Sequence, residues 1–92
     1  IGHGTRIEDH VYVASQVVIS GHCRIGQRSF LGVNATLRDF VDVGEASFVA
    51  MNAAVTRDGA AGSVVLGAQG EVLPAGDRRA RALKQKYFGE VD

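Results

Sequence analysis

The chain has 92 residues, of which ten are basic and ten acidic, so its formal net charge is zero. A chain without excess positive charge is not expected to bind nucleic acid or an anionic membrane surface, and it contains no apolar stretch near the roughly 18 residues of a membrane span. The single cysteine, Cys23, excludes an intrachain disulfide and indicates a reducing compartment, so we expect a cytoplasmic location. A compact domain of this length buries little surface, which favours a repeat architecture or a partner.

From the first residue onward, an aliphatic side chain recurs at every sixth position. The ten aliphatic residues are Ile1, Ile7, Val13, Ile19, Ile25, Leu31, Leu37, Val43, Val49 and Val55. A helix would repeat its apolar face every three or four residues, whereas a period of six fits a short strand, a corner and another short strand. The repeat therefore predicts a parallel β-helix, whose coils bond to neighbours about 4.8 Å above and below. Because the chain begins in mid-pattern, we expect it to be a piece of a longer protein.

Within each hexad, a small residue commonly follows the aliphatic one, and the fifth position is mostly small or β-branched. This pattern resembles that of the hexapeptide-repeat acyltransferases, from Ile1 to about Gly67. The resemblance implies an all-β fold, a left-handed parallel β-helix of triangular section, with about 18 residues in each of about three coils. It also implies a homotrimer that uses acetyl-CoA. Residues 1–67 would form the β-helix domain and residues 68–92 a C-terminal extension.

With that coil length, the sixth hexad positions point outward and stack into three faces. One face is charged and is expected to be solvated, one is aromatic, and one carries small residues that suit burial between subunits. Their members are Arg6, Arg24 and Asp42; Tyr12, Phe30 and Phe48; and Val18, Thr36 and Ala54, respectively. The stacked aromatic side chains either steady their sheet or are covered by a sister subunit or by the C-terminal segment, through Tyr87 and Phe88.

The fourth hexad positions are expected at the corners of the coil. Asn34 and Asn52, stacked above Gln16, are predicted to take the left-handed backbone conformation that asparagine tolerates; holding the pantetheine arm of coenzyme A is the alternative role for them. His10 belongs to a different corner, which we expect to be solvated. Cys23 occupies an inward fifth position, so it is predicted to be buried and inert.

Beyond Val55 the hexad pattern fades. The segment GAQGEVL predicts a glycine-containing connection between two short strands, Val64–Leu66 and Glu71–Leu73. The segment DRRARALKQKYFG predicts a C-terminal helix that begins after Asp77 and ends at Gly89. Its basic side chains are expected either to be solvated or to attract the phosphates of coenzyme A.

His3 is the candidate catalytic residue, because it lies at a corner between Gly2 and Gly4, where its ring has room. Acyl transfer from a thioester requires a base for the attacking group, and an imidazole suits that role near neutral pH. A backbone N–H beside a glycine can stabilise the charge that develops on the thioester oxygen. Binding both substrates together supplies their orientation.

The stretch IGHGTRIEDHVYV resembles the histidine-containing segment of sugar acetyltransferases of sialic-acid and bacillosamine biosynthesis, with His3 at the position of the catalytic base. The resemblance implies transfer of an acetyl group from acetyl-CoA to an amino or hydroxyl group of a sugar or nucleotide sugar. Gly21, Asn34 and Asn52 would place the pantetheine arm between subunits. Two residues depart from the family pattern: Gly4 stands where some relatives have an acidic residue, and Gln16 where many close relatives have a histidine.

Two other functions compete with acyl transfer. Zinc enzymes of the gamma carbonic anhydrase type need three converging histidines, two of them five residues apart. Here the gaps are seven residues, from His3 to His10, and twelve, from His10 to His22, so no metal is expected. The second alternative is a truncated β-helix that acts as a non-catalytic oligomerisation module, which Gly4 and Gln16 favour.

Overall fold

The computed structural model describes residues 1–89, which form ten two-residue strands and one C-terminal helix. The strands are β1 (Arg6–Ile7), β2 (Tyr12–Val13), β3 (Val18–Ile19), β4 (Arg24–Ile25), β5 (Phe30–Leu31), β6 (Thr36–Leu37), β7 (Asp42–Val43), β8 (Phe48–Val49), β9 (Ala54–Val55) and β10 (Val64–Val65). The helix is α1 (Arg78–Phe88). Each strand contains the sixth residue of one hexad and the first residue of the next, with the exception of β10.

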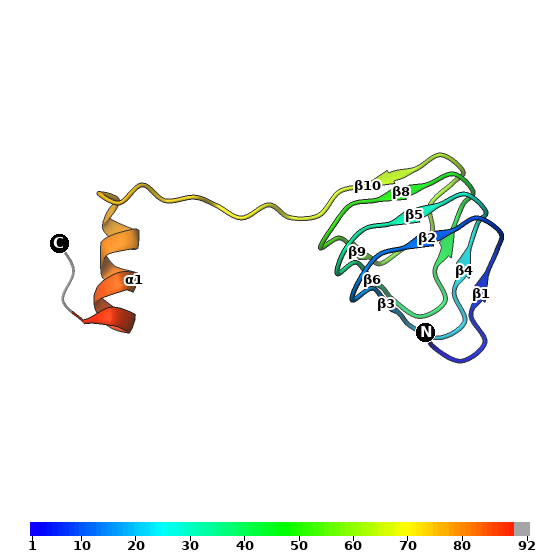
Figure 1. Cartoon of the computed structure of the whole chain (residues 1–92), viewed down its shortest axis with the longest axis horizontal. Helices are drawn as coiled ribbons and strands as arrows, with labels where there is room; N and C mark the ends of the chain where they lie inside the picture. Colours follow the sequence, from blue (N-terminus) through cyan, green and yellow to red (C-terminus); the bar gives the residue numbers. More distant parts are fainter. Residues whose placement is uncertain (90–92) are drawn as a thin grey trace.

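The strands stack into three parallel sheets that form the sides of a triangular coil (Figure 1). The sheet orders are β1-β4-β7, β10-β8-β5-β2 and β3-β6-β9, and from β1 to β9 paired strands are 18 residues apart, as in Arg6 with Arg24. The predicted β-helix of about three coils is therefore confirmed. We call its sides the charged face (β1, β4, β7), the aromatic face (β2, β5, β8, with β10) and the small-residue face (β3, β6, β9).

The core is a narrow column of the aliphatic first positions. Ile25, Leu31, Leu37 and Val49 have no exposed surface, whereas Ile1, in the outermost coil, is 82% exposed. Each inward side chain rests on its counterpart one coil away because the strands pair in register, so dispersion contacts accumulate along the axis. No buried side-chain nitrogen or oxygen among residues 1–89 lacks a hydrogen-bond partner.

The corners use a left-handed backbone at the fourth hexad position. Among residues 1–89, eight non-glycine residues have a φ angle between 54° and 63°, and Asn34 and Asn52 are two of them, as predicted. Isolated residues other than glycine pay for this conformation, and backbone bonds between coils offset the cost. The N–H of Asn34 donates to the carbonyl of Ser15 at 3.0 Å, and that of Asn52 to the carbonyl of Val33 at 3.0 Å.

The coil does not end where the hexad pattern fades. Gly59 forms a bridge with Val43, and β10 then pairs with β8, so that Val64 lies over Phe48 and Val65 over Val49. These partners are 16 rather than 18 residues apart, because this last partial coil has lost two residues at a corner. There the carboxylate of Asp58 accepts the backbone N–H of Asp42 at 2.8 Å.

The predicted strand pair was wrong in its second member. Residues 66–74 contain no strand, and within Glu71–Leu73 the side chain of Val72 is 91% exposed. Val64 and Val65 pair with β8 of the preceding coil instead, and that register packs the partly buried side chain of Val65 against the core.

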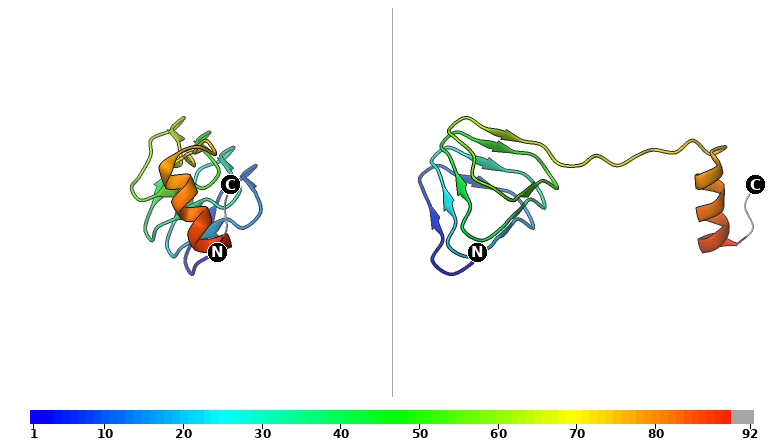
Figure 2. Two further views of the ribbon diagram at one scale, coloured as in Figure 1. Left: turned by 90° about the vertical axis from the view of Figure 1, so that its left-hand side faces the viewer. Right: turned by 180° about the vertical axis from the view of Figure 1, so that it is seen from behind.

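The C-terminal helix has the predicted bounds. Asp77 caps it by accepting the N–H of Arg79 at 2.7 Å, and the N–H of Gly89 donates to the carbonyl of Gln85 at 3.0 Å. The bonds to Arg79 lower the pKa of Asp77, because they favour its charged form. An extended segment carries α1 away from the coil (Figures 1 and 2). Within residues 1–89, no helix has the length and apolar character needed to cross a bilayer.

Cys23 lies inside the coil, as predicted, with 2% exposure and its Sγ 3.1 Å from the carbonyl oxygen of Arg38. We therefore expect the native protein to react with a thiol reagent such as dithionitrobenzoate over hours and the denatured protein within seconds. A Gln69→Cys variant, whose thiol would lie on the exposed extended segment between β10 and α1, should label at once under native conditions. Rapid labelling of Cys23 itself would contradict the register of the hexads.

Candidate functional site

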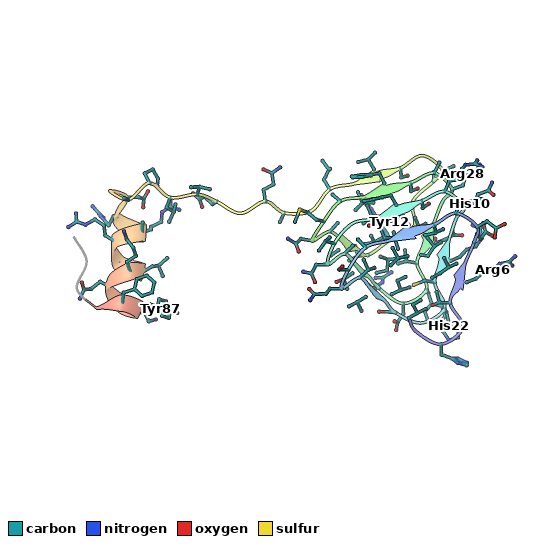
Figure 3. The ribbon with its side chains drawn as sticks, viewed as in Figure 1. Arg6, His10, Tyr12, His22, Arg28 and Tyr87 are labelled. Atoms are coloured by element: carbon teal, nitrogen blue, oxygen red, sulfur yellow. The ribbon has the colours of Figure 1, made fainter. Side chains whose placement is uncertain are left out.

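His3 lies at the corner between the small-residue face and the charged face, which we call the His3 corner. Three coils contribute to it, with the segments 2–4, 20–22 and 38–40. Figure 3 shows His22, its central member, at the edge of the triangle opposite Tyr12 on the aromatic face. The side chain of His3 is exposed, so its imidazole can meet a molecule arriving from solvent.

The aromatic rings of this corner stack along the coil axis. The rings of His3 and His22 meet edge to face, with centroids 6.0 Å apart and an interplanar angle of 87°. The ring of His22 then stacks on that of Phe40 at 4.9 Å and 10°. Gly4 makes room for this arrangement, because a Cβ atom there would lie 2.5 Å from Nδ1 of His22. His3 is thus held beside a second imidazole, itself backed by an exposed phenyl ring.

Gly21 shares the corner with His3 but does not present a free donor. Its backbone N–H donates to Oδ1 of Asp39 at 3.3 Å, and its carbonyl accepts the N–H of Phe40 at 3.0 Å. An oxyanion at Gly21 would first have to displace the Asp39 carboxylate. The hexad register already stacks residues 38–40 over this corner, but the contact itself depends on the rotamer of Asp39, which no pattern in the sequence indicates.

Asn34 and Asn52 lie at a different corner, between the aromatic and the small-residue faces, which we call the asparagine corner. Nδ2 of Asn34 donates to Oδ1 of Asn52 at 2.7 Å, so the two amides form a ladder. Both side chains are exposed. Beside Asn52, the segments 50–52 and 66–70 line a hollow of about 430 Å³. One chain therefore brings His3 and Gly21 together, and the small-residue face separates them from Asn34 and Asn52.

His10 belongs to the remaining corner, as predicted, next to Arg28 (Figure 3). Its backbone is left-handed, with φ 59°, and its side chain is exposed. The three histidines therefore do not converge. No group of three or more potential metal ligands occurs in the part of the chain that the structure describes.

The charged side chains of the charged face pair with one another from coil to coil. Arg24 donates to Asp42 at 3.1 Å and forms an ion pair with Glu8 at 3.3 Å. The hydrogen bond to Asp42, followed by the attraction of Glu8, raises the pKa of Arg24. Asp42 and Glu8 lie on the same side of the coil as Arg24, so the charged face needs no external counter-charge and suits contact with water.

Comparisons with family models, with curated proteins and with solved structures found no match to this chain.

Gly4 is expected to be the residue on which the ring arrangement at the His3 corner depends. It has φ 74°, so Gly4→Ala should destabilise the fold by about 1–2 kcal/mol for the left-handed alanine and should displace the ring of His22. Denaturant unfolding and the imidazole proton shifts of His22 would measure the two effects. Gly70→Ala is the matched control, because a Cβ there meets nothing within 4 Å; equal effects of the two substitutions would contradict the prediction.

Proposed function

We propose that this chain is part of an acetyl-CoA-dependent acyltransferase, in which His3 is the general base that deprotonates an amino or hydroxyl group of a sugar or nucleotide sugar. The observation that carries the proposal is the exposed His3 ring, held at a corner against the edge of His22 at 6.0 Å. A base must reach a proton on a substrate that comes from solvent. An imidazole on an open corner of a rigid coil meets that requirement.

The rest of the reaction would fall to neighbouring groups. As the acceptor attacks the thioester carbon, its proton passes to the neutral imidazole of His3. The carbonyl oxygen gains charge and needs a donor, and the N–H of Gly21 would serve once Asp39 releases it. The tetrahedral intermediate then expels the coenzyme A thiolate, which recovers a proton from the imidazolium of His3.

A homotrimer is part of the proposal, because one chain leaves the candidate residues apart. The small-residue face lies between the His3 corner and the asparagine corner. Packing this face against a neighbouring copy would bring Asn34 and Asn52 of one subunit toward His3 and Gly21 of the next. The pantetheine arm of acetyl-CoA would then lie between subunits. We place the reaction in the cytoplasm, in keeping with the unpaired thiol of Cys23.

A non-catalytic β-helix module is the second candidate, and one specific observation favours it. The N–H of Gly21, the donor that the proposal assigns to the oxyanion, is already bonded to Asp39 at 3.3 Å. If that bond persists when ligands are present, the His3 corner lacks its oxyanion donor. The coil would then serve to hold copies of the protein together.

The small-residue face predicts a trimer. Light scattering on the 92-residue chain at micromolar concentration should give about 29 kDa, three times the chain mass of 9.7 kDa. Thr36→Arg, in the middle of this face, should shift the mass toward that of the single chain, because a charge buried between copies without a partner is costly. Ala61→Arg, at an exposed turn, is the control. A wild-type chain that stays monomeric would argue against the interface.

Replacement of His3 is expected to lower the rate of acyl transfer rather than the affinity for acetyl-CoA. In the full-length protein, His3→Asn should lower kcat for release of coenzyme A by about 10²–10⁴-fold, the usual contribution of a general base. Acetyl-CoA binding, measured by calorimetry, should change little because the base acts on the acceptor. His10→Asn, at another corner, is the matched control. If His3→Asn kept about a third of the wild-type turnover, the base would be assigned wrongly.

A further inference from the structure

The helix α1 has no surface to pack against in its own chain. None of its residues is buried, and its large apolar side chains Leu83, Tyr87 and Phe88 are 52%, 72% and 78% exposed. It has 11 residues, and isolated helices shorter than about 12–15 residues are marginal in water. A helix that carries two exposed aromatic rings at its end therefore needs a docking surface to persist.

The aromatic face is likewise uncovered. Tyr12, Phe30, Phe48 and Val64 form four consecutive rungs and are 58%, 37%, 45% and 63% exposed. The three rings stack with centroids 4.9 Å and 5.1 Å apart, so they present a flat, continuous apolar strip. Contiguous apolar surface of this kind marks an interaction site.

The two surfaces match in length and in chemistry. Four rungs at a spacing of about 4.8 Å extend over about 14 Å, and 11 residues of helix extend over about 16 Å. The spacing of Ala80, Leu83 and Tyr87 aligns them on one side of α1, and the basic residues Arg79 and Lys84 flank that side. Lysine and arginine bind aromatic faces, and Nζ of Lys86 already lies 5.7 Å from the ring centroid of Tyr87.

We propose that α1 of one copy docks on the aromatic face of a second copy, with its Ala80, Leu83 and Tyr87 side against the stacked rings. The extended segment between β10 and α1 favours docking on the aromatic face of a second copy over docking on that of the same chain. The chain leaves the aromatic face itself at β10 and continues in an extended segment that carries α1 beyond the coil (Figures 1 and 2). Residues 66–76 can bridge about 35 Å when extended, which is enough to reach a neighbour.

Other occupants fit less well. Two α1 helices would not pair with each other, because each carries five positive charges and no negative one between Arg78 and Phe88. An acidic partner bound to α1 would satisfy the charges and leave the aromatic face exposed. Docking between copies covers both surfaces at once. It involves neither the His3 corner nor the small-residue face, so it holds or fails independently of acyl transfer.

Cysteine pairing between copies tests the proposal. In a Cys23→Ala background, a tagged Phe48→Cys chain is mixed with an untagged Tyr87→Cys chain and oxidised gently. We expect a mixed disulfide as the main product. Arg78→Cys, on the opposite side of α1, and Val18→Cys, on the small-residue face, are the matched controls and should give at least tenfold less. Circular dichroism establishes that each variant retains the coil.

Two results would overturn the proposal. No excess of the Phe48–Tyr87 product over the controls would show that α1 does not reach this face. In the double variant Phe48→Cys/Tyr87→Cys, a disulfide that forms only within one chain, seen as a monomer on a non-reducing gel at every concentration, would show that α1 folds back on its own coil. A product that crosses between chains and increases with concentration supports the proposal.

Discussion

The structure depends on the register between coils, in which each residue lies over the residue 18 positions later. The register is fixed by backbone bonds such as that from the N–H of Val18 to the carbonyl of Ala35 at 2.9 Å, and by the inward aliphatic side chains that stack at the same interval. A slip of one residue would turn every inward side chain outward. The same register therefore sorts the exterior into three faces and three corners, and it decides which side chains can meet.

This constraint explains why the candidate site extends over several coils and why one chain keeps its candidate residues at two separate corners. His3, His22 and Phe40 come from three successive coils, and their rings meet because the corner repeats in register, edge to face between His3 and His22 and stacked between His22 and Phe40. Residues at another corner cannot join them without breaking that register. A single chain can therefore build only a ladder of like positions, and a site that combines two corners requires a second copy.

The hexad pattern predicted the positions of β1–β9 and the inward burial of Cys23, because a repeat without insertions permits only one register between successive coils. It failed after Val55, where the last partial coil is two residues shorter. There a side chain, the Asp58 carboxylate bonded to the N–H of Asp42, takes the place of a regular corner. The same limit applies to the site. The 18-residue register placed Gly21 below residues 38–40, but whether the Asp39 carboxylate accepts the N–H of Gly21 depends on a rotamer and not on the repeat.

Asp39 is the residue on which the two candidate functions diverge. Its carboxylate accepts the N–H of Gly21 and lies in the same corner as the imidazole of His3. In an acyltransferase it would have to leave when the thioester oxygen enters, and an anion so close to the reacting carbonyl would otherwise oppose the charge that develops there. In a module that only holds copies together, the same bond simply closes the corner. The corner can therefore catalyse acyl transfer only if substrate binding costs the protein this one weak, exposed hydrogen bond, which at 3.3 Å is long enough to give way.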